Sequence, residues 1–306
     1  MPRAIRYERL ATERANRASR ALDRLGARAI ATLMNREDAR AVRAVGREAT
    51  RIAAAVDLIV AALSARGRLF FVGAGTSGRL GVLEAAECPP TFGTPPRLVQ
   101  AIMAGGRGAV FRSREGAEDD ARTAVRAVRA RVRRGDVVVG VSASGVTPFV
   151  SGALSAARRL GAATVLVSCN PSRGAARARV VIAPSPGPEV LAGSTRLKAG
   201  TATKLVLNTL TTASMARLGK MYGNRMVDVQ PRSRKLRERA ARLVEELGGV
   251  TQPRARRLLA ASRGSVRVAV VMARTGAAAP RAARALRAAG GSLRQALVGA
   301  RSRSER

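Results

Sequence analysis

Three turns rich in glycine or hydroxyl groups could bind a charged ligand, and the shortest of them is Ser-Cys-Asn at residues 168–170. The first, residues 73–78, reads Gly-Ala-Gly-Thr-Ser-Gly, and the second, residues 142–147, reads Ser-Ala-Ser-Gly-Val-Thr. Each follows a short apolar run that is typical of a buried strand. A helix that begins after such a turn offers free N–H groups and a positive dipole to an anion. Together the two turns predict a site for one phosphate group.

The first turn also fits the spelling G-x-G-x-x-G of dinucleotide-binding folds. Those folds place an Asp or Glu about 20 residues further on, where it binds the ribose. Residues 98–104, which occupy that zone, contain no acidic residue. A phosphorylated small molecule is therefore favoured over a dinucleotide. Plain tight turns with helix caps and no ligand remain the alternative.

The chain contains no histidine, so any acid–base chemistry must come from carboxylates, Lys, Tyr or Cys. Glu87 is a strong candidate because it precedes Cys-Pro-Pro at an expected helix end, where the helix dipole does not favour an acid. Glu118 lies in the acidic run 115–120 at an expected helix start, where a solvated acid is the ordinary outcome. Glu84, one turn before Glu87, is expected to be structural, and Cys88 to be packed.

Alternating strands and helices over the middle of the chain must position these groups. Strands are expected at 69–72, 98–103, 137–141, 164–167 and 180–183, and helices at 78–86, 115–133, 147–159 and 195–218. This alternation is typical of βαβ units and predicts a parallel sheet with helices on both faces.

Helices are also expected on both sides of this core. The N-terminal ones span 12–33 and 36–65, the second beginning after Asn35 as its N-cap. Beyond Pro231, helices are expected at 235–247, 253–262, 278–288 and 291–299, with one strand-like run at 266–272. We therefore predict an N-terminal helical segment (1–65) packing on the core, an α/β core (66–230) and a mostly helical C-terminal region (231–306).

The 306-residue chain carries a net charge of +36, which by itself would indicate a nucleic-acid partner. The arginines are scattered, however, and only five Phe, two Tyr and no Trp are available to stack on bases. We expect nonspecific polyanion binding at low salt but no specific nucleic-acid function. Without a long apolar run we expect no membrane span, and two cysteines without disulfide-like spacing favour the cytoplasm.

Several strings of the sequence resemble the N-acetylmuramic acid 6-phosphate etherases, a family of the sugar isomerase (SIS) fold group. They are Gly-Ala-Gly-Thr-Ser-Gly-Arg-Leu-Gly-Val-Leu (73–83), Ala-Glu-Cys-Pro-Pro-Thr-Phe-Gly (86–93), Ser-Ala-Ser-Gly (142–145) and Gly-Ser-Thr-Arg-Leu-Lys-Ala-Gly-Thr-Ala (193–202). The likeness runs from about residues 12–16 to residues 290–297, and so covers nearly the whole chain.

The resemblance implies an SIS-type parallel sheet flanked by helices, a homodimer, and catalysis without a metal or redox cofactor. It implies a carbon–oxygen lyase that removes D-lactate from N-acetylmuramic acid 6-phosphate by elimination and hydration, giving N-acetylglucosamine 6-phosphate in the recycling of peptidoglycan sugars. The family's two functional glutamates correspond to Glu87 and Glu118. The first is expected to protonate departing lactate and activate water, and the second to act as base at C2.

The binding residues are expected in three places. The phosphate candidates are Gly75, Thr76, Ser77, Gly78, Ser142, Ser144, Gly145 and Thr147. Ser194, Thr195, Arg196 and Lys198 are expected to complete the sugar pocket or build a dimer interface, with a plain helix-start cluster as the alternative. Val146 departs from the family, many members of which carry Arg there, and this bears on affinity for the substrate or its identity.

Three other functions remain open at this point. A non-catalytic sugar-phosphate sensor similar to glucokinase regulatory protein would share the phosphate turns without needing both glutamates. An SIS-type isomerase acting at C1 and C2 would have no use for an acid beside the C3 oxygen. An arginine-driven nucleic-acid binder would keep its affinity near 0.2 M salt, roughly where nonspecific contacts weaken.

Overall fold

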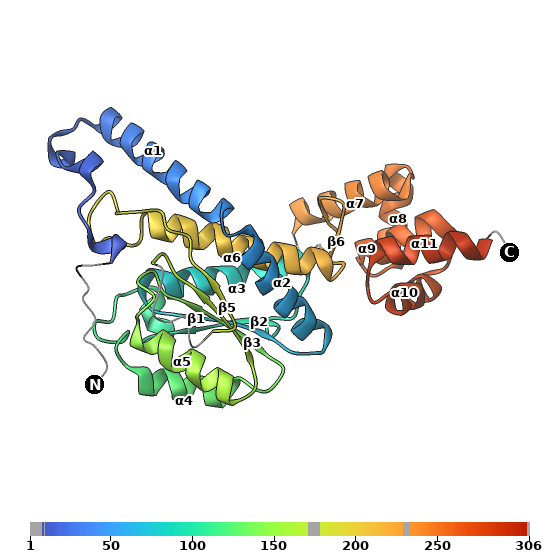
Figure 1. The fold of residues 1–306 in the computed structure, drawn as a ribbon. Helices are drawn as coiled ribbons and strands as arrows, with labels where there is room; N and C mark the ends of the chain where they lie inside the picture. The colour runs from blue at the N-terminus through green and yellow to red at the C-terminus, as the bar shows by residue number, and fades with distance from the viewer. Residues whose placement is uncertain (1–7, 9, 171–177, 229–232, 305–306) are drawn as a thin grey trace. The chain divides into compact units, whose positions relative to one another are not determined.

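The structure is a computed structural model that describes residues 8, 10–170, 178–228 and 233–304 (Figure 1). The chain divides into two compact units. The first contains residues 1–86 and 96–212, and the second contains residues 87–95 and 213–306. Each unit has a hydrophobic core of its own.

A five-stranded parallel sheet forms the centre of the first unit. Its strands are β1 (Leu69–Gly73), β2 (Val99–Met103), β3 (Val137–Val141), β4 (Ala163–Val167) and β5 (Val180–Ile182), in the order β2-β1-β3-β4-β5. Every residue of β1 and β3 is buried. Continuous apolar runs of this kind are what a parallel sheet covered on both faces requires, and the predicted fold class is confirmed.

Helices cover the two faces of this sheet (Figure 1). On one face lie α4 (Ala121–Arg131) and α5 (Pro148–Arg159); on the other lie α2 (Ala49–Ser64), α3 (Gly75–Phe92) and α6 (Lys198–Arg217). Phe70, Val138, Leu166, Phe149 and Leu154 are among the buried residues that pack between the sheet and the first pair. A short 3-10 helix, η5 (Arg107–Val110), follows β2.

The strand order creates a switch point between β1 and β3. From β1 the chain crosses to β2 on one side and then returns to β3 on the other. The two connections therefore leave in opposite directions, and the carboxyl ends of β1 and β3 form the position at which open α/β sheets bind ligands. The glycine-rich turn follows β1 and the hydroxyl-rich turn follows β3, so both predicted turns lie at this switch point.

The N-terminal region differs from the prediction. Three short 3-10 helices, η2 (Ala11–Glu13), η3 (Arg17–Ser19) and η4 (Leu22–Arg24), precede α1 (Ala27–Gly46). Asn35 lies inside α1 and caps nothing, so the predicted break there is wrong. Leu33, Glu37 and Ala41 are buried at helical spacing across that position, and this continuous buried stripe outweighs the capping preference of one Asn.

The second unit consists of a small hairpin and a helical cluster. The hairpin pairs β6 (Met221–Tyr222) with β7 (Arg225–Met226). The helices are α7 (Arg234–Gly248), α8 (Gln252–Ala261), α9 (Val266–Thr275), α10 (Ala279–Ala288) and α11 (Leu293–Ser304). Within the described ranges, no helix is long and apolar enough to cross a membrane.

The strand predicted at 266–272 is wrong, because these residues form the buried helix α9. Ser265 caps this helix by accepting a hydrogen bond from the backbone N–H of Val268, and Gly276 ends it in the left-handed conformation. Val266, Ala269 and Val270 are buried against the neighbouring helices. Tertiary packing therefore overrides the strand preference of a valine-rich run.

Candidate active site

The turn after β1 is tight because glycine occupies its three critical positions. Gly75 begins α3 with a positive φ of 52°. A Cβ on Gly78 would lie 2.6 Å from the carbonyl oxygen of Gly73 and 2.3 Å from Met103 Sδ. Strand and helix thus approach more closely than any side chain would permit. Thr76 and Ser77, in the first turn of α3, are half-buried, and backbone N–H groups in this turn are available to an anion.

The turn after β3 gathers three hydroxyl groups. Ser142 Oγ lies 2.8 Å from Thr147 Oγ1 and 3.3 Å from Ser144 Oγ, and it accepts a hydrogen bond from the N–H of Gly145 at 3.0 Å. Gly145 has a φ of 74°, which glycine adopts without strain. The hydroxyls therefore converge on one another and can turn toward a bound anion.

The Thr147 hydroxyl has a position that helix capping does not explain. Thr147 is the N-cap residue of α5, yet its side chain makes no capping hydrogen bond. Pro148 follows and brings no N–H to the helix start. The interpretation of this turn as a plain helix cap therefore fails for Thr147, whose hydroxyl faces Ser142 instead.

The turn after β4 and the N-terminal segment join the same edge of the sheet. The side chain of Asn170 donates to the carbonyl oxygen of Ala143 at 2.9 Å and to Thr12 Oγ1 at 3.3 Å, and accepts from the N–H of Ala11 at 2.8 Å. Cys169 is free and buried, and burial raises the pKa of its thiol to about 12. This thiol is packed and is no nucleophile at neutral pH.

The start of α6 reaches the same turns. A Cβ on Gly200 would lie 3.8 Å from Thr76 Cγ2, and Cys169 Sγ lies 3.6 Å from the carbonyl oxygen of Ala199. Just before α6, Ser194 and Thr195 are half-buried and Arg196 is exposed. The predicted group 194–198 thus leads into the part of α6 that lies beside these turns, and its role in binding stays a prediction.

Lys198 behaves differently from its neighbours in that group. Its side chain is fully buried, and its ammonium lies 2.7 Å from a carboxylate oxygen of Glu37 and donates to the carbonyl oxygen of Pro186 at 3.1 Å. In this structure the ammonium is therefore engaged inside the protein, while its place among substrate-binding residues stays a prediction.

Glu118 lies next to the hydroxyl-rich turn. Its carbonyl oxygen accepts a hydrogen bond from the N–H of Phe149, two residues after Thr147. The side chain of Glu118 is exposed. It does not cap α4, because Asp120 does so by accepting a hydrogen bond from the N–H of Thr123 at 2.9 Å. The alternative explanation of Glu118 as a first-turn acid of that helix is therefore weakened.

Glu87 lies on α3 in the short segment that belongs to the second unit, and it is exposed. Pro89 and Pro90 follow it, and Gly93 ends the helix with a φ of 63°. A Cβ on Gly93 would lie 2.9 Å from Asp228. Only glycine therefore fits between this turn and Asp228.

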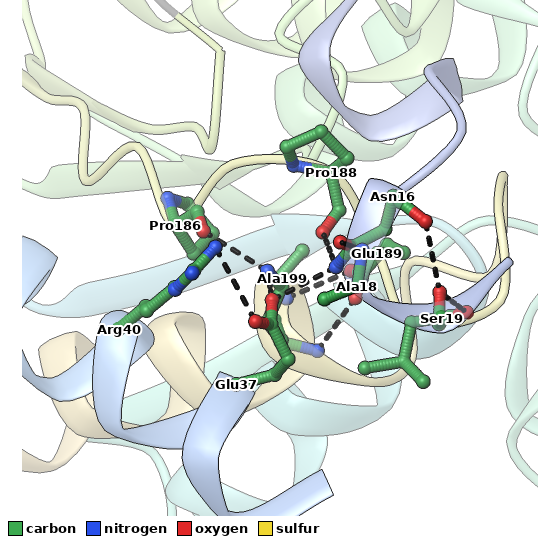
Figure 2. A network of polar contacts seen from close by, with 11 residues as sticks. Asn16, Ala18, Ser19, Glu37, Arg40, Pro186, Pro188, Glu189 and Ala199 are labelled. Atoms are coloured by element: carbon green, nitrogen blue, oxygen red, sulfur yellow. Dashed lines mark hydrogen bonds and ion pairs between the residues drawn. The ribbon is translucent and has the colours of Figure 1, made fainter. Parts of the chain in front are cut away.

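Glu84 forms a structural ion pair, as predicted. One of its carboxylate oxygens lies 2.8 Å from Lys204 Nζ, and the other accepts from Thr211 Oγ1 at 2.5 Å. A second lysine, Lys220, pairs with Asp228 at 3.7 Å. The buried residues Asn16, Glu37 and Glu189, to which the sequence assigned no role, form a polar network around Lys198 at the start of α6 (Figure 2). In the described part of the chain, no three His, Cys, Asp or Glu side chains gather as a metal site would need.

Known proteins with similar sequences cover nearly the whole chain. One from Symbiobacterium thermophilum is 52% identical over 268 residues, spanning 87% of this chain and 89% of its own, and is named N-acetylmuramic acid 6-phosphate etherase. Proteins of the same name from Geobacillus thermodenitrificans and Gloeobacter violaceus are 51% and 54% identical, covering 87% and 86% of this chain and 90% and 87% of their own.

A family profile and solved structures also match. The profile of the glucokinase regulatory protein N-terminal SIS domain matches residues 51–158. A solved protein of E. coli CFT073 aligns with a TM-score of 0.49 and 16% identity, over 65% of this chain and 97% of that one. A phosphoheptose isomerase from Neisseria gonorrhoeae aligns with a TM-score of 0.43 and 21% identity, over 58% of this chain and 94% of that one.

Proposed function

Because the chain belongs to the N-acetylmuramic acid 6-phosphate etherase family, we propose that Glu87 and Glu118 are the two groups that carry its reaction. The chain is a carbon–oxygen lyase that cleaves the D-lactyl ether of N-acetylmuramic acid 6-phosphate. The observation that carries this assignment is identity of about half the residues with etherases over most of both chains. No observation favours a sensor, since the regulatory-protein profile matches residues 51–158 alone.

The reaction needs one base and one acid. In the open-chain sugar the C1 aldehyde acidifies the C2 proton, and the lactyl ether at C3 is β to that carbonyl. A base removes the C2 proton, the C3–O bond breaks, and lactate leaves with a proton from the acid. Water then adds its oxygen to C3 and a proton returns to C2. The sequence is redox-neutral, and two carboxylates are sufficient for both halves.

The phosphate is proposed to bind where the turns after β1 and β3 meet. Gly75, Thr76, Ser77 and Gly78 contribute the start of α3, and the hydroxyls of Ser142, Ser144 and Thr147 lie within 3.5 Å of one another. A phosphate dianion accepts hydrogen bonds from both donor sets and gains from the helix dipole. Ser194, Thr195 and Arg196 are proposed to bind the sugar.

Glu118 is the proposed base, because its backbone is bonded next to the hydroxyl cluster. Glu87 is the proposed acid. We expect Glu87→Gln to abolish lactate release while exchange of the product's C2 proton in D₂O continues. Glu118→Gln should abolish both, and Glu115→Gln, in the same acidic run, should abolish neither. Cleavage without exchange in Glu87→Gln would mean that the two roles are reversed.

We also propose a homodimer in which Glu87 serves the partner's site. Glu87 is nine residues beyond Gly78 on α3 (87 − 78), which is about 14 Å along the helix. That length exceeds a hexose phosphate, so the Glu87 acting on a phosphate held at Gly75–Gly78 would come from a second copy. Co-expression of Glu87→Gln with Ser142→Ala should then restore lactate release at low substrate concentration, where neither variant alone is active. No recovery in mixed dimers would place both residues in one chain's site.

The phosphorylated substrate suggests a location in the cytoplasm, because a sugar phosphate does not cross membranes unaided. The buried thiol of Cys169, which forms no disulfide, agrees with that compartment.

A further inference from the structure

A buried ion pair lies behind the loop that leads into α6 (Figure 2). Glu37 of α1 and Lys198, the first residue of α6, have fully buried side chains, and Lys198 Nζ lies 2.7 Å from Glu37 Oε2. The same carboxylate oxygen accepts a hydrogen bond from Asn16 Nδ2 at 2.8 Å. Arg40, half-exposed, lies 3.3 Å from the other oxygen.

This network holds the loop through three of its backbone carbonyls and through the side chain of Glu189. Lys198 donates to the carbonyl oxygen of Pro186, Asn16 to that of Pro188 at 3.2 Å, and Ser19 to that of Val190 at 2.7 Å. The carboxylate of Glu189 accepts the first two N–H groups of α6, those of Lys198 and Ala199, at 2.8 and 2.9 Å. Figure 2 shows these contacts converging from the N-terminal segment, α1 and the loop.

The loop fixed in this way ends at the site. The N–H of Gly193 donates to the carbonyl oxygen of Thr12, whose hydroxyl accepts from Asn170. Residues 194–196 follow, and α6 then begins beside Thr76. A displacement of Glu37 would therefore also displace residues 194–196, because the loop backbone connects them.

Stability alone does not explain a charged pair at this position. Taking two charges out of water is unfavourable, and apolar replacements of buried pairs are often at least as stable. The chain also uses Lys at only four of its 56 basic positions, yet one of the four is fully buried here. A guanidinium is larger than an ammonium and presents a fixed planar fork, which does not suit the two acceptors around Lys198 Nζ.

We propose that Glu37 is a positioning residue for the lyase reaction: acting through Lys198 and Asn16, it sets residues 194–196 and the start of α6 at the sugar site. The proposal rests on the proposed function, because its readout is lactate release. Glu37 itself touches no substrate in this account.

The first experiment compares Glu37→Gln with wild type in steady-state lactate release. We expect KM to rise about tenfold, the effect of misplacing hydrogen bonds to a charged ligand. The kcat should stay within about twofold, because the loop binds the sugar while the acid and base lie elsewhere. Asp136→Asn is the matched control, because Asp136 is also buried and pairs with Arg68 at 2.7 Å. This pair lies at the amino ends of β1 and β3, away from the proposed site, so the KM of Asp136→Asn should match that of wild type.

A double-mutant cycle then separates positioning from general destabilisation. If Glu37 acts through the loop, Glu37→Gln should raise KM much less in a Thr195→Val background than in wild type. Equal KM ratios in the two backgrounds would overturn the proposal. So would a folded Glu37→Gln protein with wild-type KM.

Two further outcomes are a Glu37→Gln protein that does not fold and a wild-type protein that releases no lactate. If Glu37→Gln does not fold, the pair Glu37→Met/Lys198→Met removes both charges together and should fold; a wild-type KM in that variant refutes the proposal. Wild-type protein that releases no lactate would instead refute the proposed function, which keeps the two failures distinct.

Discussion

Replacing Ser142 by Ala tests the hydroxyl cluster with little disturbance of the fold. Ser142 Oγ accepts the N–H of Gly145, but that N–H also donates to the carbonyl oxygen of Ser142, so no buried donor is left unpaired. We therefore expect unfolding free energy to fall by only about 1 kcal/mol. A hydrogen bond to a charged group contributes about 1.5–3 kcal/mol, so affinity for the phosphate should fall roughly 10- to 150-fold.

Calorimetric titration of the product, N-acetylglucosamine 6-phosphate, measures this directly, with thermal unfolding as the check on folding. Ser168→Ala is the matched control. Its hydroxyl is equally buried and follows the neighbouring strand β4, but it bonds to the backbone of Asn170 within its own turn. Its product affinity should stay within about twofold of wild type. A folded Ser142→Ala protein that also binds product within that range would refute the phosphate assignment.

Two other predictions concern stability. Gly78→Ala would place a Cβ 2.6 Å from the Gly73 carbonyl oxygen, and overpacking of this kind lowers the free energy of unfolding by about 1–3 kcal/mol. Thermal unfolding should show this loss of stability. The control Gly108→Ala, where the added Cβ has open space around it, should unfold like wild type. Burial opposes ionisation of Glu37, but its hydrogen bonds and nearby cations outweigh this and lower its pKa below the ordinary 4.5. As pH falls, Glu37 is therefore protonated in the unfolded state before it is protonated in the folded state. The free energy of unfolding by which wild type exceeds Glu37→Gln should be full above about pH 4.5 and disappear as pH falls through the lowered pKa. Urea unfolding between pH 7 and pH 3 that shows a constant difference would contradict this.

The sequence predicted the parts of the fold that have local signals. Each predicted strand of the parallel sheet was found within two residues of its expected ends, because uninterrupted apolar runs between helices have few other interpretations. The valine-rich run of α9 was wrongly predicted to be a strand, because its local signals conflict with one another. Its β-branched residues favour a strand, and only Ser265 and Gly276 at its ends indicated a helix. Packing inside the second unit decided the outcome.

The same distinction holds for the site. The turns carry recognisable local strings, and the structure brings the hydroxyls of Ser142, Ser144 and Thr147 together as expected. The partnership of Glu37 with Lys198 spans 161 positions. No local sequence pattern can predict a pairing of that kind, because the pairing depends on how α1 and α6 pack against each other.

The most direct test of the lyase reaction is incubation of the purified protein with N-acetylmuramic acid 6-phosphate in H₂¹⁸O. We predict release of unlabelled D-lactate, with ¹⁸O at the C3 hydroxyl of N-acetylglucosamine 6-phosphate. Label in the lactate would contradict elimination followed by hydration, and a folded protein that releases no lactate would contradict the assigned function.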